Sequence, residues 1–336
     1  MHDRPEPTTS RPVVLCTLPL HESALPLLTP VADVRVASSP HADSLREQLG
    51  EADYLVVRTH LPSDLLHQPH RLKAIVRHGT GLDMIPMESA TQQGIPVANV
   101  PGANAQAVTE YVVGALLALA RRFGDLDHGL RHGGWTTARA HAQNAFELTG
   151  KTLGVVGLGD IGCRVAQACH AGFGMRVLGY QPQPGDAPAH VQRVGLEELL
   201  ASSDFVSLHC PLTPQTRHLI DARRLASMKP GAFLINAARG EVVDEAALAQ
   251  ALRARTLRGA ALDVFAAQPL ANDHPFLQLD NVLLTPHVAA LTEESTQRMS
   301  QGTAEQLLQL IRGERPRFLV NPEVWAAWPH RVPNAS

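Results

Sequence analysis

Short apolar runs alternate with helix-length segments along most of the chain, and this alternation restricts the possible folds more than any other feature. A first series ends before residue 101 and contains PVVLCTL, ADVRVA, YLVVRT, LKAIVRHG and IPVANV. A second series follows, with KTLGVVG, MRVLGY, DFVSLH, GAFLINA, LRGAALDV and NVLLTP. Strands that alternate with helices form βαβ units and pair in parallel. The sequence therefore predicts an α/β protein with two doubly wound parallel sheets, the second with the six strands of a complete Rossmann sheet.

The length of 336 residues predicts two domains, because a domain averages about 150 residues. We expect one domain to be discontinuous and flavodoxin-like, from residues 1–103 and 289–336. Residues 104–288, which contain the second series of strands, would form the other domain, of the Rossmann type. The crossings near residues 101–102 and 286–289 would be the hinges of a cleft between the two domains.

Long helices are predicted beside both crossings. Residues 103–122 are apolar on most faces, which suits a helix that joins the domains or forms a subunit interface. In residues 291–313, Thr292 is a candidate N-cap, and Glu293 and Glu294 occupy the first turn, where acidic side chains are favourable. The proline-containing tail from Asn321 onward is expected to be a loose arm or a surface strap.

Composition excludes several classes of function. A net charge of −3 without a basic run argues against nucleic-acid binding. The longest apolar stretch, residues 111–120, is too short to cross a membrane, and residues 1–12 resemble a frayed leader and neither a signal peptide nor an anchor. Four cysteines without framework spacing suit a reducing cytoplasm, and no residues have the spacing of metal ligands, so we expect no metal.

The segment GVVGLGDIG, residues 154–162, runs from a predicted strand into the predicted helix CRVAQACH. In such a turn, Gly157 allows the tight bend, Gly159 allows close approach of a pyrophosphate, and Gly162 allows the helix to pack on the strand. Phosphates bind at the helix N-terminus, where unpaired N–H groups and the helix dipole attract anions. The turn therefore predicts a dinucleotide site that includes Asp160 and Ile161 as well as the three glycines. Residues 104–288 would then be the dinucleotide-binding domain, and residues 1–103 with 289–336 the substrate domain.

Gln181 occupies the end of the second strand of this unit, where a carboxylate would bind the adenosine ribose hydroxyls of NAD. A glutamine does not repel a 2′-phosphate, but the adjacent QPQPGD contains no Arg or Lys to bind one. The cofactor is therefore predicted to be NAD or NADP, with NADP slightly favoured or both used.

Arg239 and His287 follow two later strands of the second series. In an open α/β sheet, ligands bind beyond the carboxyl ends of the strands. A guanidinium binds a carboxylate and polarises the neighbouring carbonyl, and a histidine donates a proton to the forming alkoxide. The pair predicts hydride transfer between a carbonyl and an alcohol. Taken singly, Arg239 could be a surface ion-pair partner and His287 a loop residue, but their joint occurrence at strand ends favours catalysis.

Several stretches, taken in order, resemble the D-isomer-specific 2-hydroxyacid dehydrogenases over about residues 50–315. They are RHGTGLDMI, NVPGANAQAVTEYV, GKTLGVVGLGDIG, HCPLTPQTRHLI, NAARGEVVDEAAL, ALDVF and TPHVAALTEES. The resemblance implies reduction of a small 2-oxo acid, such as glyoxylate or hydroxypyruvate, to the D-2-hydroxy acid by a homodimer. It also implies that Arg239 binds the substrate carboxylate and that His287 is the general acid/base.

The resemblance assigns roles to further residues, position by position. Asp263 matches a carboxylate near the nicotinamide amide. The loop of residues 77–81 matches one whose backbone N–H groups hold the substrate carboxylate. Other substrate-side contacts are implied for Arg58, His78, Gly79, Thr80 and Asn104. Loops that line the cofactor are implied for Cys210, Pro211, Thr216, Ala237, Ala238 and Ala289.

One catalytic position departs from the family. The family writes D-V-F-x-x-E-P, and its glutamate pairs with the histidine, whereas this chain has Gln268 before Pro269. An amide oxygen keeps the imidazole oriented but loses most of the charge that raises its pKa. We therefore expect an altered His287 with a lower pKa, a reduction profile shifted to lower pH, and a lower rate.

Alternative functions remain open from the sequence. A dinucleotide-sensing protein, like the transcriptional corepressors of this fold, would bind cofactor without turnover, and Gln268 favours it slightly. Oxidation of formate or phosphite on the same scaffold is a third possibility. Trp135 suits either a subunit contact or an ordinary core position.

Overall fold

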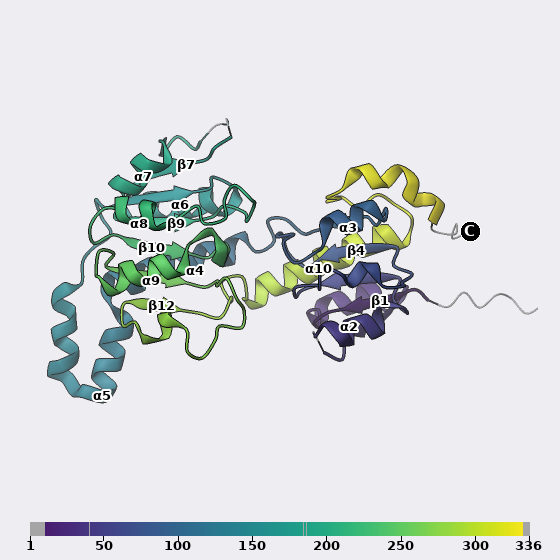
Figure 1. Ribbon diagram of the computed structural model, residues 1–336, viewed down its shortest axis with the longest axis horizontal. Coiled ribbons are helices and arrows are strands. Elements are labelled where there is room, and N and C mark those ends of the chain that lie inside the picture. The colour runs from purple at the N-terminus through teal and green to yellow at the C-terminus, as the bar shows by residue number, and fades with distance from the viewer. Residues whose placement is uncertain (1–10, 40, 184, 186, 332–336) are drawn as a thin grey trace, which may run out of the picture. The chain divides into compact units, whose positions relative to one another are not determined.

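The chain divides into two compact units. A computed structural model describes residues 11–39, 41–183, 185 and 187–331 (Figure 1). One unit comprises residues 1–104 and 292–336, and the other comprises residues 105–291. Residues 1–10 of the expected leader lie outside the description. Both units are built on parallel sheets with helices, which confirms the predicted α/β class.

The discontinuous unit contains a five-stranded parallel sheet in the order β2-β1-β3-β4-β5. This is the strand order of flavodoxin-like folds. The inner strands consist mainly of aliphatic residues, and these are almost fully buried. The strands are β1 (Val13–Cys16), β2 (Asp33–Val36), β3 (Tyr54–Val57), β4 (Ala74–Arg77) and β5 (Val97–Ala98). The α-helices of this unit are α1 (Leu25–Leu28), α2 (Ala42–Leu49), α3 (Met87–Gln92) and α10 (Glu293–Ile311).

The prediction for α10 is confirmed in detail. The hydroxyl Oγ1 of Thr292 accepts a hydrogen bond from the backbone N–H of Ser295 at 3.1 Å, so Thr292 is the N-cap. One face of the helix, including Leu307 and Leu310, packs into the core of this unit.

Residues 321–328 of the tail pack against their unit, so of the two alternatives the loose arm was wrong for this part; residues 332–336 lie outside the description. Residues Pro322–Arg331 form a 3₁₀ helix. Trp328 is fully buried in it, stacks on Trp325 with ring centroids 4.7 Å apart, and donates from Nε1 to the carbonyl of Lys73 at 2.6 Å. Burial of a large indole outweighs the extended-chain preference of the tail prolines.

The second unit contains a seven-stranded parallel sheet in the order β12-β11-β10-β9-β6-β7-β8, which is Rossmann-like. Six of its strands match the predicted runs: β6 (Thr152–Val156), β7 (Arg176–Tyr180), β9 (Phe205–Leu208), β10 (Phe233–Asn236), β11 (Gly259–Leu262) and β12 (Val282–Leu284). The seventh, β8 (Val191–Arg193), was missed because this edge strand is three residues long and two of them are exposed. The α-helices are α4 (Ala105–Arg121), α5 (Phe123–His141), α6 (Asp160–Phe173), α7 (Leu196–Ser202), α8 (Ala222–Ser227) and α9 (Glu245–Arg253).

Helix α5 is unusually exposed for its length. Figure 1 shows it projecting away from the sheet of its own unit. Gly134 kinks it with φ 75°, and only two of its residues are buried. Trp135 is 71% exposed, and Phe123 and Leu130 are also exposed. The core alternative for Trp135 is therefore wrong. Among the described residues, no helix is both long and apolar enough to cross a membrane.

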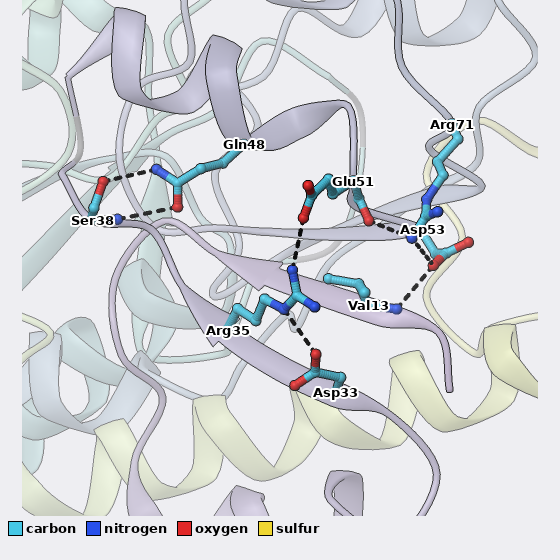
Figure 2. Close-up of polar contacts among 8 residues, drawn as sticks. All are labelled: Val13, Asp33, Arg35, Ser38, Gln48, Glu51, Asp53 and Arg71. Carbon is cyan, nitrogen blue, oxygen red and sulfur yellow. Dashed lines mark hydrogen bonds and ion pairs between the residues drawn. The ribbon is translucent and has the colours of Figure 1, made fainter. Parts of the chain in front are cut away.

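A buried carboxylate ties together the start of the five-stranded sheet. Asp53, which precedes β3, accepts from the backbone N–H of Val13 at 2.9 Å and from Arg71 at 3.2 Å, as Figure 2 shows. Lys73 lies 3.2 Å from its other oxygen. By contrast, Asp33 and Arg35 form an ion pair in which both side chains are about half exposed.

Replacing Asp53 with Ala is expected to destabilise this unit by about 2 kcal/mol, because the buried N–H of Val13 loses its acceptor. Urea unfolding followed by tryptophan fluorescence measures the effect, since Trp325 and Trp328 lie in the same unit. The control is Asp33→Ala, which removes an exposed pair worth about 0.5 kcal/mol. Equal losses from the two variants would contradict the assigned role of Asp53.

Candidate functional site

The predicted cofactor and catalytic residues of the second unit lie at one edge of its sheet. The strands are parallel, so their carboxyl ends share this edge. Along the edge, Gln181 follows β7, the glycine turn follows β6, and Cys210 follows soon after β9. Further along, Arg239, Asp263 and His287 follow β10, β11 and β12, three neighbouring strands. Ligands of doubly wound sheets bind at this edge.

The glycine turn has the geometry that its sequence requires. Gly157 adopts φ 100°, and a Cβ there would lie 2.8 Å from the backbone nitrogen of Cys210. A Cβ on Gly162 would lie 2.0 Å from the carbonyl oxygen of Gly157, so only glycine allows the helix to start this close to the strand. At Gly159, by contrast, a Cβ would meet nothing within 4 Å among the described atoms.

The start of α6 suits a phosphate group. Its N-cap is Gly159, which has no side chain to accept from the first amides, and the first helical N–H bond is that of Cys163 to the carbonyl of Gly159. The amides of Asp160, Ile161 and Gly162 are therefore available to an anion. The carboxylate of Asp160 pairs with Arg164 at 2.7 Å, which reduces its repulsion of a bound phosphate.

Gln181 folds back on the glycine turn. Its Oε1 accepts from the backbone N–H of Leu158 at 3.1 Å. The segment QPQPGD itself contains no cation, as the sequence shows, but the missed strand β8 brings Arg193 to this loop. The prediction that the segment itself supplies no Arg or Lys agrees with the sequence, but a cation reaches the loop from a strand that the sequence did not reveal.

The loop after β9 is held by its own side chains. Thr216 donates from its hydroxyl to the carbonyl of Pro211 at 2.6 Å and accepts from the N–H of Thr213 at 2.8 Å. Burial raises the pKa of Cys210 to about 11, so its thiol stays protonated near neutral pH. A protonated thiol is a poor nucleophile, so Cys210 is suited to lining a site and not to covalent catalysis.

Two residues that sequence reasoning missed shape the loop that carries Arg239. The side chain of Asn236 accepts from the N–H of Ala238 at 3.0 Å and donates to the carbonyl of Arg239 at 2.9 Å. A Cβ on Gly240 would lie 2.0 Å from the carbonyl carbon of Phe265, so glycine allows the loops after β10 and β11 to touch. The arrangement N-x-x-R-G was the available sequence signal.

Asp263 fixes the turn that carries His287. Its carboxylate accepts from the hydroxyl of Thr285 at 2.6 Å, from the N–H of Val288 at 2.8 Å and from the N–H of Ala289 at 2.9 Å. His287 itself adopts φ 57°, which is strained for a non-glycine residue. Asp263 is 1% exposed. The family resemblance predicted that Asp263 lies near a nicotinamide amide. In the structure, the Asp263 carboxylate supports the turn that carries His287.

The same turn is braced from α4. The Tyr111 hydroxyl lies 2.7 Å from the Thr285 hydroxyl. Burial, together with the nearby charge of Asp263, raises the pKa of Tyr111 to about 12, although the hydrogen bond with Thr285 opposes this shift. The phenol therefore stays neutral over the physiological range and keeps its proton for hydrogen bonding.

Gln268 orients the imidazole of His287. Its Nε2 donates to the carbonyl of Phe265 at 3.1 Å, and its Oε1 lies 2.9 Å from Nδ1 of His287. A carbonyl oxygen only accepts, so the amide nitrogen must face Phe265 and the amide oxygen must face the ring. In the neutral ring, Nδ1 is therefore the protonated nitrogen and Nε2 the unprotonated one.

The predicted substrate-side residues lie in the other unit. Arg58 follows β3, donates to the carbonyl of Pro19, and has its pKa lowered by burial. The side chain of His78 is buried and bonded to Ser300 Oγ at 2.9 Å, so it is directed into its own unit. Burial and the charges of Arg58 and Arg77 lower the pKa of His78 to about 3. The imidazole is therefore neutral.

The remaining predicted substrate-side residues are Gly79 and Thr80, which belong to the loop after β4, and Asn104, which has an amide side chain. Gly79 has φ 123°, and the hydroxyl of Thr80 donates to the carbonyl of Val100 at 3.4 Å. The buried Oδ1 of Asn104 has no hydrogen-bond partner within the described part of the chain.

A cavity of the second unit lies away from this site. It measures about 830 Å³ and is lined near the amino ends of β10 and β12 by Phe233, Arg258 and Val282. That edge of the sheet is opposite the glycine turn. No cluster of three or more His, Cys, Asp or Glu side chains that could bind a metal occurs among the described residues.

Comparison with known proteins agrees with these observations. A model of the NAD-binding domain of the D-isomer-specific 2-hydroxyacid dehydrogenases matches residues 113–289. The chain is 40% identical to a glyoxylate reductase of Aeropyrum pernix over 326 residues, which cover 94% of this chain and 97% of that protein. It is 42% identical to a D-3-phosphoglycerate dehydrogenase of Methanocaldococcus jannaschii, over 92% of this chain but only 59% of that longer protein.

A solved structure agrees as well. The NADPH-dependent glyoxylate/hydroxypyruvate reductase of Sinorhizobium meliloti, in complex with NADP and malonate, superposes with a TM-score of 0.82 at 28% identity. The match covers 93% of this chain and 97% of that one. The chain therefore belongs to the D-isomer-specific 2-hydroxyacid dehydrogenase family, and residues 113–289 are its NAD-binding domain.

Proposed function

We propose that this protein reduces a small 2-oxo acid to the D-2-hydroxy acid with NADH or NADPH, and catalyses the reverse oxidation. The observation that carries the proposal is the contact between Gln268 and His287, which presents Nε2 of the imidazole for proton transfer. Gly240 holds the loop of Arg239 against Phe265, the residue that also anchors Gln268. Membership of the family supports the same reaction.

The residues divide the chemistry between them. NAD(P)H, when bound, supplies the hydride that adds to the carbonyl carbon. Arg239 binds the substrate carboxylate and polarises the carbonyl oxygen, and protonated His287 gives that oxygen its proton from Nε2 and becomes neutral. In the reverse direction, neutral His287 takes the hydroxyl proton. Gln268 is a positioning residue, because it acts through the imidazole.

Cofactor contacts are proposed along the carboxyl edge of the seven-stranded sheet. The amides at the start of α6 would hold the pyrophosphate, and Gln181 would lie beside the adenosine ribose. The loops after β9, β10 and β12 would line the rest, through Cys210, Pro211, Thr216, Ala237, Ala238 and Ala289. Contacts to the substrate carboxylate are proposed for the backbone of residues 77–81. Arg58 and Asn104 are proposed as further contacts to the substrate.

A substrate panel tests the proposal. We expect glyoxylate or hydroxypyruvate to drive oxidation of NADH or NADPH, followed by absorbance, and chiral analysis of a chiral product to find the D isomer. Cofactor binding with only trace oxidation would indicate a sensing protein. Oxidation of formate or phosphite, with no activity on 2-oxo acids, would indicate the third alternative. Either outcome contradicts the proposal.

Replacing Gln268 with Glu is expected to move the pH profile of reduction upward by about one unit. Reduction requires protonated His287, so the rate falls as pH rises through the pKa of the imidazole. A carboxylate at residue 268 stabilises the charged ring and raises that pKa. The measurement is kcat/KM for 2-oxo acid reduction against pH.

The matched control for this variant is Gln250→Glu, which adds the same charge at an exposed position of α9. Its profile should coincide with that of the parent protein. A profile for Gln268→Glu that also coincides with the parent would show that Gln268 does not tune His287.

We propose that the protein forms a homodimer through helix α5. The exposed side chains of Phe123, Leu130 and Trp135 place large apolar groups on a helix with few buried residues. Such exposure on a projecting element is typical of an interaction surface.

Four cysteines that form no disulfide, all in the described part of the chain, support a reducing cytoplasmic location.

The double variant Leu130→Ala, Trp135→Ala is expected to convert the dimer to monomer, because it removes two apolar anchors of the interface. Light scattering coupled to size-exclusion chromatography measures the mass. Leu277→Ala removes an equally exposed leucine elsewhere on the same unit and should remain dimeric. A parent protein that elutes as a monomer, or a double variant that stays dimeric, contradicts this assignment.

A further inference from the structure

The loop that follows β7 is held by an arginine from a neighbouring strand. Strand β8 pairs in parallel with β7, and the register sets Arg193 opposite Gly179, two residues before Gln181. Both strands end at the carboxyl edge of the sheet. Arg193 therefore reaches the place where the adenosine ribose of a dinucleotide lies in a Rossmann sheet.

The hydrogen bonds of the Arg193 guanidinium go to neutral carbonyl oxygens and do not neutralise its charge. Nη2 donates to the carbonyl oxygens of Gln181 and Gln183, each at 2.9 Å, and Nη1 donates to the carbonyl of Gly185. These acceptors are neutral. The three contacts use three of the five N–H donors of a guanidinium, which is charged at all relevant pH values. The side chain as a whole is exposed, so the remaining donors are accessible.

Gln181 complements this cation. Its Oε1 is engaged by the N–H of Leu158 at 3.1 Å, so the amide end left for a ligand is the Nε2 donor. A carboxylate in this position accepts from the 2′-hydroxyl of NAD and repels a 2′-phosphate. Gln181 lacks that negative charge, and its remaining donor suits a phosphate oxygen better than a hydroxyl proton.

We propose that Arg193 and Gln181 bind the 2′-phosphate of NADP(H), and that the protein therefore prefers NADPH to NADH. The inference rests on the proposed reduction, since it specifies the cofactor of that same site. Arg193 supplies the charge, and the side chain of Gln181 and the anchored loop position it. The glycine turn and the start of α6 are common to both cofactors and do not discriminate between them.

Direct binding tests the inference without turnover. Cofactor fluorescence titrations of the full chain with NADPH and with NADH give the two dissociation constants. The unchanged protein should bind NADPH more tightly. In Arg193→Gln, NADPH affinity should fall about tenfold, as expected for one lost charge-assisted hydrogen bond, and NADH affinity should change less than about twofold. Calorimetry with 2′,5′-ADP and 5′-AMP should give the same pattern.

Two further variants separate charge recognition from loop support. Gln181→Glu keeps Arg193 and adds a negative charge, so NADPH should bind more weakly and NADH more tightly. Arg176→Gln is the matched control, because Arg176 is an exposed arginine at the amino end of β7, bonded to Gln192 at 2.8 Å. It should leave both affinities unchanged. If Arg193→Gln does not fold, Gln181→Glu alone decides the question.

The outcomes distinguish this inference from the proposed function. Equal or tighter binding of NADH by the unchanged protein, or an equal loss of both cofactors in Arg193→Gln, would overturn the 2′-phosphate site. Reduction of 2-oxo acids with NADH preferred would overturn it while sustaining the proposed function. Tighter NADPH binding without turnover of any 2-oxo acid would sustain the site and contradict the proposed function.

Discussion

A single buried carboxylate controls the geometry on which the candidate chemistry depends. Asp263 directly follows β11 and accepts three hydrogen bonds from residues 285–289, so the turn after β12 is bound to the end of the neighbouring strand. This turn holds His287 at a positive φ that an unsupported histidine would rarely adopt. The loop of Gln268 starts from the same strand end and reaches back to the imidazole. The orientation of the ring thus follows from the parallel pairing of β11 and β12.

The strand order of the seven-stranded sheet separates two tasks along one edge. Gln181, the glycine turn and Arg193 occupy the end formed by β6, β7 and β8, where backbone amides and a cation suit phosphate groups. Arg239, Gln268 and His287 occupy the end formed by β10, β11 and β12, where a guanidinium suits a carboxylate and an oriented imidazole suits proton transfer. An extended dinucleotide matches such an edge, because its two halves need different surroundings.

Features that depend on local spacing were predictable from the sequence, and those that depend on burial or on distant pairing were not. The glycine turn, the cap of α10 and the strands with long apolar runs were predicted because each has a local signal. Strand β8 has only three residues, so Arg193 had no recognisable partner in sequence. Trp328 lies in a proline-containing tail, and only the packed structure shows its burial. The hydrogen bonds of the His78 side chain with Ser300 and of the Thr216 hydroxyl with the carbonyl of Pro211 likewise appear only in the folded structure.

The protonation of His287 tests the central arrangement most directly. In nitrogen-15 NMR of histidine-labelled protein, the His287 signals are assigned by their loss in His287→Gln. The contacts of Gln268 predict that neutral His287 carries its proton on Nδ1 and leaves Nε2 unprotonated. A neutral ring protonated on Nε2 would mean that the imidazole is not oriented by Gln268, and would contradict the assigned route of proton transfer.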